Sequence, residues 1–196
     1  MEEVDMRVSK AQVAENRARL LAETARMIRE AGIAGSGVDA LARAAGFTHG
    51  SLYSQFGSKE RLVAEALAEA MAASDAVQAD RLPPGGGIGR FAAQYLSPAH
   101  RDRPGTGCAL AAIGPEAARE GSAVRSTFTA ALRRMAGRLA AALPLEPKAA
   151  EPAALASLST LVGALILARA VDDPELSDRI LAAGRSHLSA GDAGGA

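Results

Sequence analysis

The stretch 37–62 constrains the fold more than any other part of this sequence. Apolar residues at helical spacing predict a short helix over 38–45, which ends at Gly46 because glycine adopts the left-handed conformation without steric cost. Thr48 stands where a helix N-cap belongs and predicts a second short helix over 49–56. Two short helices joined by a turn with glycine are typical of a helix-turn-helix, whose second helix enters a DNA major groove.

The second predicted helix has an apolar and a polar side. Leu52 and Phe56 lie four residues apart and are expected to face inward. Ser58 can cap a following helix, and Lys59 then lies at a helix start, where an ammonium and backbone N–H groups can share one phosphate. The side that remains free carries small or polar residues: His49, Gly50, Ser51, Tyr53, Ser54 and Gln55.

These residues resemble the DNA-binding signature of the TetR family of bacterial transcriptional repressors. The resemblance covers about residues 17–67 and is carried by Leu41-Ala42, Ala45-Gly46-Phe47-Thr48, Gly50-Ser51-Leu52-Tyr53 and Phe56-Gly57-Ser58-Lys59-Glu60. It implies that the sugar-phosphate backbone is held by Thr48, Ser51, Tyr53 and Lys59, and that base edges are faced by His49, Gly50 and Ser54. Family members usually carry Thr or Ser in place of Gly37, so the cap of the first short helix is weaker here or shifts to Ser36.

Helical periodicity without strand alternation predicts an all-α fold with two domains. We expect residues 1–57 to form an N-terminal three-helix helix-turn-helix domain, in which 1–11 are a mobile arm and a helix over about 12–31 ends at Gly32. Residues 58–190 are expected to form a helical effector-binding and dimerisation domain, followed by a disordered tail at 191–196. The helices predicted in the second domain cover about 58–79, 88–96, 122–143, 149–171 and 174–188, with a loop at 97–107 and a break at Gly114-Pro115.

Charge and composition narrow the partners and the compartment. The whole chain has no net charge, but residues 6–62 hold nine basic and five acidic side chains, as a mildly basic phosphate-contacting domain should. A single cysteine excludes an internal disulfide and fits the reducing cytoplasm. The chain opens without a signal-like leader, and the longest apolar region, 155–171, contains enough polar residues to look too polar and too short for a membrane span. We therefore expect a soluble, cytoplasmic protein with no membrane partner.

The middle helices are expected to enclose a pocket for a small-molecule effector of unknown identity. Core packing is the more common role for any single apolar residue there. Arg169 stands alone in an apolar helix and fits a carboxylate ligand, an interfacial acid or a solvated rim equally well. The candidate pocket residues are Phe91, Tyr95, Cys108, Leu110, Phe128, Met135 and Leu161.

The last two predicted helices offer wide apolar faces, which the resemblance implies form a four-helix dimer interface. Some of these residues must instead pack inside the subunit, and Gly163, Ala164 and Gly184 allow close helix approach. The candidate interface residues are Leu155, Leu158, Val162, Leu165, Ile166, Leu176, Ile180 and Leu188.

The resemblance thus predicts a homodimeric repressor that binds a palindromic operator and is released by an effector. One alternative is a repressor that senses electrophiles or oxidants through Cys108, which follows a loop with Arg101 and Arg103 at a helix start. Another is a dimeric ligand-binding protein without DNA binding, although Tyr53 and Lys59 argue against a degraded motif. We expect no enzyme, cofactor or metal site, because the three histidines lie far apart in sequence and the lone cysteine has no histidine beside it.

Overall fold

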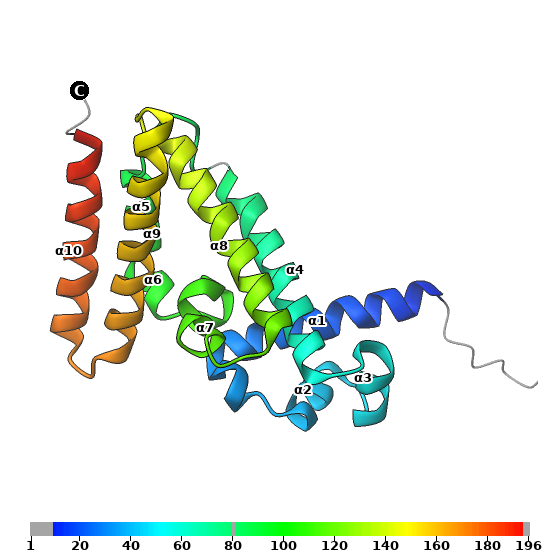
Figure 1. Cartoon of the computed structure of the whole chain (residues 1–196). Coiled ribbons are helices and arrows are strands. Elements are labelled where there is room, and N and C mark those ends of the chain that lie inside the picture. The colour runs from blue at the N-terminus through cyan, green and yellow to red at the C-terminus, as the bar shows by residue number, and fades with distance from the viewer. Residues whose placement is uncertain (1–9, 80, 194–196) are drawn as a thin grey trace, which may run out of the picture.

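The computed structural model describes residues 10–79 and 81–193, and within these ranges all regular structure is helical (Figure 1). The predicted all-α fold is therefore confirmed. Its elements are α1 (Lys10–Gly35), α2 (Val38–Ala45), α3 (His49–Phe56), α4 (Lys59–Ala79), α5 (Gly89–Tyr95), α6 (Pro98–Arg101), a 3-10 turn η1 (Pro104–Thr106), α7 (Ala109–Ala117), α8 (Ser122–Ala142), α9 (Pro147–Ala170) and α10 (Pro174–Ala193).

The helix-turn-helix forms where it was predicted. Gly46 takes a left-handed conformation at the end of α2, with φ 75° and ψ 30°, and the Thr48 side chain caps α3. The inward faces of α1 to α4 enclose a first hydrophobic core, consistent with the apolar spacing of α2 and α3. This core consists of Leu20, Leu21, Ala25, Leu41, Ala42, Leu52, Phe56, Leu62 and Ala66.

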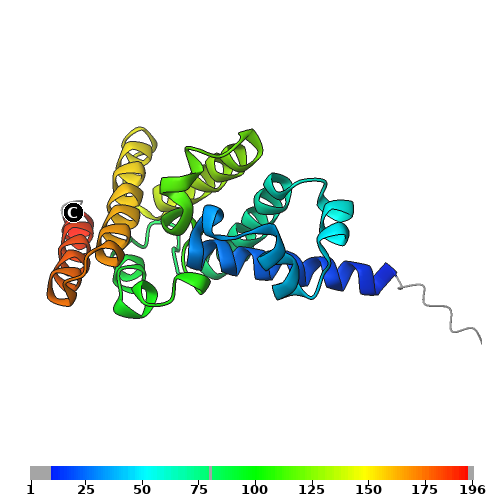
Figure 2. The same cartoon turned by 90° about the horizontal axis from the view of Figure 1, so that it is seen from below.

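A second, larger core fills the remainder of the molecule. The long helix α4 packs along α8, α8 packs on α9, and α9 packs on α10. Helices α1 and α4, which help to form the first core, also contribute to the second. Their residues in the second core include Ile28 and Ile33 on α1 and Val63 and Leu67 on α4. Figure 2 shows α2 and α3 at one end of the molecule and α10 at the other. Helices α1 and α4 therefore connect the helix-turn-helix mechanically to the second core.

Several predicted boundaries were wrong. The expected loop over 97–107 contains α6 and η1, because Ser97 Oγ caps α6 by accepting from the His100 N–H at 3.2 Å. Helix α7 runs through the expected break and includes Pro115, since burial of Ile113 and Ala117 offsets the one backbone hydrogen bond that proline removes.

The predicted ends of the chain also need correction. Residues 10–11 of the predicted arm begin α1, and residues 191–193 of the predicted tail belong to α10. The remainder of both segments, 1–9 and 194–196, lies outside the described residues.

The end of α1 is held by two side chains, those of Ser36 and Glu116. Gly32 breaks the helix with φ 78° and ψ 169°, and Ser36 Oγ donates to its carbonyl at 2.7 Å. Ser36 therefore does not cap α2, and Gly37 at that position provides no side-chain cap, so the expectation of a weaker cap is confirmed. The Ala34 N–H donates to Glu116 Oε2 of α7 at 3.0 Å, which ties the end of α1 to the second core.

We predict that Gly32→Ala destabilises the fold by about 1–3 kcal/mol, because this backbone conformation is nearly exclusive to glycine. A Cβ at Gly32 would also overlap the Glu116 carboxylate and displace it from Ala34. Urea unfolding followed by circular dichroism measures the change. Gly35→Ala is the matched control, because its Cβ would come no closer than 3.4 Å to another atom. Equal midpoints for the two variants would contradict the role given to Gly32.

Helix α9 begins two residues earlier and ends one residue earlier than predicted. With 24 residues it is, by length and composition alone, apolar enough to cross a membrane, which corrects the expectation that this region is too short and too polar. Core helices of soluble proteins pass the same test, and α9 packs between α8 and α10 (Figure 1). Only 28% of the most apolar stretch of α9 is buried within the subunit, so an apolar side of this helix is left uncovered.

Candidate DNA-binding surface and ligand pocket

The start of α3 is fixed by a reciprocal capping arrangement. The Ser51 N–H donates to Thr48 Oγ1 at 3.2 Å, and the Thr48 N–H donates to Ser51 Oγ at 3.1 Å. With Leu52 and Phe56 fully buried, the helix can present only its other side to a partner. Two of the predicted DNA contacts, Thr48 and Ser51, therefore also set the geometry of the helix that carries the others.

The exposed side of α3 carries the predicted base-facing residues. Tyr53 is 39% exposed, and its ring centroid lies 4.9 Å from that of His49, so each ring limits the other's rotamers. His49 Nε2 lies 3.9 Å from Asp39 Oδ1 on α2. A Cβ at Gly50 would meet nothing within 4 Å, so this position is open to solvent, as close approach to a groove requires. Ser54 is also exposed.

Lys59 is less free than the sequence suggested. Its ammonium donates to the Ile33 carbonyl at 2.8 Å and so ties the start of α4 to the end of α1. Because an ammonium has three donors, two remain for a phosphate. Ser58 Oγ caps α4 by accepting from the Arg61 N–H at 3.1 Å, as predicted.

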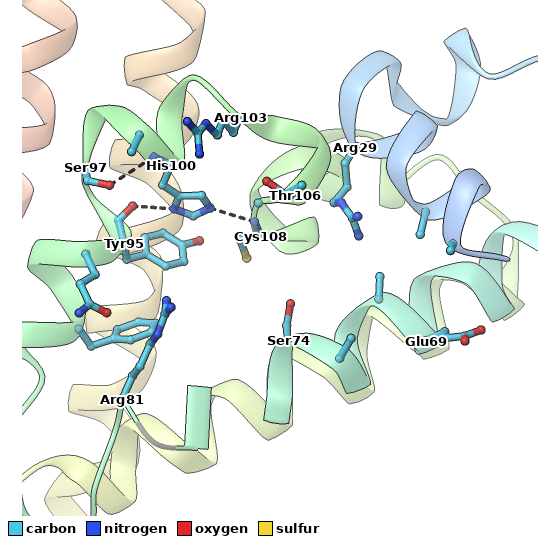
Figure 3. A pocket seen from close by; sticks show the side chains of 18 of the residues that line it. Arg29, Glu69, Ser74, Arg81, Tyr95, Ser97, His100, Arg103, Thr106 and Cys108 are labelled. Atoms are coloured by element: carbon cyan, nitrogen blue, oxygen red, sulfur yellow. Dashed lines mark hydrogen bonds between the residues drawn. The ribbon is translucent and has the colours of Figure 1, made fainter. Parts of the chain in front are cut away.

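A cavity of about 740 Å³ lies between the helices that hold the helix-turn-helix and those of the second core (Figure 3). Its size is within the usual range for small-molecule sites. One wall comes from α1 and α4, and the other from α5, α6, η1 and the residue that starts α7. The lining residues are Leu21, Ala22, Ala25, Arg29, Glu69, Ala70, Ala73, Ser74, Arg81, Phe91, Gln94, Tyr95, Ser97, Ala99, His100, Arg103, Thr106, Gly107 and Cys108.

Three of the seven predicted pocket residues, Phe91, Tyr95 and Cys108, line this cavity. The other four do not line it and pack in or against the larger core: Leu110, Phe128, Met135 and Leu161.

His100 organises the wall of the pocket that contains Cys108. Its Nε2 accepts from the Cys108 backbone N–H at 2.9 Å, so the ring proton is on Nδ1, which donates to the Tyr95 carbonyl at 2.6 Å (Figure 3). Burial lowers the pKa of His100, which favours this neutral ring. Both ring nitrogens are occupied, so His100 positions its neighbours and has no donor left for a ligand.

The Tyr95 hydroxyl is a buried polar group without a hydrogen-bond partner among the described residues. The side chain is 5% exposed, and Figure 3 shows its hydroxyl and the Cys108 thiol both directed into the pocket. Burial, and secondarily the adjacent Cys108, raise the pKa of Tyr95 well above its ordinary value, so the hydroxyl stays protonated. A donor left in this state costs free energy that a bound acceptor would recover.

Arg169 has a structural role that none of the readings of the sequence anticipated. Its Nε donates to the Arg101 carbonyl at 3.0 Å and its Nη2 to the His100 carbonyl at 2.8 Å, so it fastens the end of α6 to α9. Burial lowers its pKa. Arg101 in turn donates to Asp178 of α10 at 2.7 Å. The pocket wall is therefore linked to both of the last two helices.

The predicted interface residues divide into buried, exposed and partly exposed side chains. Leu158, Leu165 and Leu188 are at most 4% exposed and belong to the subunit's own core. Leu155 is 42% exposed, and Leu167, which was not predicted, is 57% exposed. The remaining candidates are partly exposed: Val162, Ile166, Leu176 and Ile180.

Sequence patterns gave little signal for the polar residues of the pocket. These polar residues come from separate elements, and no regular spacing in the sequence connects them. They are Arg29, Ser74, Arg81, Arg103 and His100. The approach of η1 to α1, which brings most of them together, is a tertiary contact.

Comparison with known proteins agrees with the geometry of α2 and α3. Residues 20–66 match the model of a family described as bacterial regulatory proteins, tetR family. Residues 20–66 therefore form a DNA-binding domain of the TetR-family type. This match and the geometry of α3 both support a DNA-binding regulator. No curated protein matches the sequence.

Solved structures show that the whole fold is shared. The reduced form of NemR from Escherichia coli superposes with a TM-score of 0.75 at 23% identity, covering 90% of this chain and 96% of that one. A TetR-family regulator from Cytophaga hutchinsonii gives 0.74 at 20% identity, covering 96% and 98%. One from Chloroflexus aurantiacus gives 0.72 at 22% identity, covering 92% and 95%.

Proposed function

We propose that this protein is a transcriptional repressor, a homodimer that binds a palindromic operator and releases it when a small molecule occupies the pocket. The observation that carries this proposal is the position of the cavity, which has α1 and α4 as one wall. Both helices also form the core of the helix-turn-helix. A ligand that changes the distance between the two walls of the pocket therefore moves the helix-turn-helix.

The DNA contacts are assigned to the exposed side of α3 and its flanks. Tyr53 and Lys59 have donors available for phosphates, and Thr48 and Ser51 sit at the helix start, where backbone N–H groups favour an anion. His49, Gly50 and Ser54 remain for the base edges. Because no arginine lies on α3, we expect sequence recognition to rely on shape and apolar contact more than on bidentate guanine contacts.

The dimer interface is assigned to the uncovered side of α9 together with α10. Two copies of one apolar face make an isologous interface, the commonest arrangement in homodimers. In such a dimer the two α3 helices would enter successive major grooves, about 34–36 Å apart. Release requires the ligand to bind the DNA-incompetent state more tightly than the competent one.

A second mode of release is favoured by Cys108. This partly exposed residue lines the cavity, and the Cys108 N–H is fixed by His100. An electrophile with a conjugated carbonyl would add the sulfur to its β-carbon and take the thiol proton at its α-carbon, so no oxidant is needed. The adduct would then occupy the pocket as a covalent effector.

Fluorescence anisotropy of the protein on DNA from upstream of its own gene tests the proposed function. We expect one dimer per site and an affinity that falls steeply with salt, since phosphate contacts release counterions. Random DNA of the same length is the control. Equal affinity for the two DNAs would exclude an operator in this region, and a monomer in the complex would exclude the proposed dimer.

A further inference from the structure

The lining of the pocket carries a net positive charge, although the net charge of the whole chain is zero. Its ionisable lining residues include three arginines, Arg29, Arg81 and Arg103, against one carboxylate, Glu69. His100 is neutral, because its Nε2 accepts a hydrogen bond. In Figure 3, Glu69 extends along α4 away from the Tyr95 hydroxyl and the Cys108 thiol.

Arg29 is a half-buried cation without a full counterion. Its Nε donates to the Gly105 carbonyl at 2.7 Å, and within the described part of the chain no acceptor is found for its terminal nitrogens. The adjacent Glu30 is engaged by Arg26 at 2.6 Å. Burial lowers the pKa of Arg29, and the nearby Glu30 and Cys108 offset this only in part. An anion in the pocket would stabilise this guanidinium by pairing with it.

The remainder of the cavity suits an apolar body. The rings of Phe91 and Tyr95 lie 5.6 Å apart and tilted, and offer an aromatic surface. The opposite wall is formed by small and aliphatic residues of α1 and α4, including Leu21, Ala25 and Ala73. The unpartnered Tyr95 hydroxyl lies between these surfaces and needs an acceptor.

From these contacts we infer that the pocket binds an amphipathic organic anion. Its carboxylate or sulfonate pairs with Arg29, its apolar body lies on Phe91 and on the wall of α1 and α4, and one of its oxygens accepts from Tyr95. The inference rests on the proposed function, because it names the class of the effector. It also gives that effector a direct contact with α1, because Arg29 is a residue of that helix and its terminal nitrogens are available to the anion.

A pair of fluorescent probes tests the inference without DNA. 8-Anilinonaphthalene-1-sulfonate and N-phenyl-1-naphthylamine share one aromatic skeleton and differ in the sulfonate. We expect the sulfonate to bind one site per subunit at least about tenfold more tightly, the equivalent of one charge-assisted hydrogen bond. Equal affinities of the two probes, or failure of both to bind, would overturn the inference. Operator release is measured separately on DNA, so failure here is distinguishable from failure of the repressor function.

Single substitutions test which residue of the pocket pairs with the sulfonate. Arg29→Gln should abolish the preference for the sulfonate, whereas Arg19→Gln, which removes an exposed cation of the same helix that does not line the pocket, should keep it. Tyr95→Phe removes only a hydroxyl that has no partner, so the fold is retained and sulfonate affinity should fall about threefold to tenfold. A preference that survives Arg29→Gln, or an affinity unchanged in Tyr95→Phe, would contradict the assignment of that residue.

Discussion

Tyr53→Ala should weaken operator binding about 100-fold or more while leaving the fold and the dimer intact. The side chain is 39% exposed and contributes nothing to either core, so truncation should change stability by less than about 0.5 kcal/mol. A hydrogen bond to a charged phosphate contributes about 1.5–3 kcal/mol, and a dimer loses it twice. Anisotropy on the operator and sedimentation of the free protein measure the two properties.

Tyr53→Phe separates the hydroxyl from the ring in this prediction. If the hydroxyl holds a phosphate, Phe should lose nearly as much affinity as Ala. If only the stacking on His49, at 4.9 Å, is needed, Phe should bind like the parent protein. Unchanged affinity in both variants would show that the exposed side of α3 has been wrongly assigned.

Leu167→Glu should convert the dimer to a monomer and abolish operator binding with it. Leu167 is 57% exposed on α9, so the substitution leaves the subunit's core untouched. In the assembled dimer it would bury one unpaired carboxylate per subunit, each at a cost of several kcal/mol. The dimer dissociation constant should rise more than about 100-fold, measured by sedimentation velocity across a concentration series.

The matched control for this substitution is Leu145→Glu. Leu145 is 41% exposed in the loop between α8 and α9, outside the proposed interface. The control should remain dimeric and bind DNA normally. If Leu167→Glu also remains a dimer, the uncovered side of α9 is not the interface.

The helix-turn-helix could be predicted from sequence because its signals are local. Gly46 ends α2 and Thr48 caps α3 within a few residues of the helices they define. Lys59 shows the limit of such reasoning, because its bond to the Ile33 carbonyl depends on how α4 packs against α1. A side chain's position along a helix predicts its face but not its tertiary partner.

The pocket could be predicted only in part, for a physical reason. Apolar periodicity identifies the buried side of a helix, but a core residue such as Leu161 and a cavity residue such as Phe91 satisfy the same pattern. Likewise, Leu165 of the predicted interface packs inside the subunit, whereas Leu155 does not. Of the pocket's arginines, only Arg103 gave a signal, through its closeness to Cys108 in sequence, because separate elements supply Arg29 and Arg81.

The most direct test of coupling between the pocket and DNA uses the single cysteine of the chain. Because Cys108 lines the cavity, a maleimide places one bulky group there whatever the natural effector is. Operator affinity should be measured by anisotropy for the parent protein and for Cys108→Ser, each before and after treatment. We predict that alkylation lowers affinity at least about tenfold in the parent protein and leaves Cys108→Ser unchanged. Full labelling of Cys108 with no change in operator affinity would contradict release through this pocket.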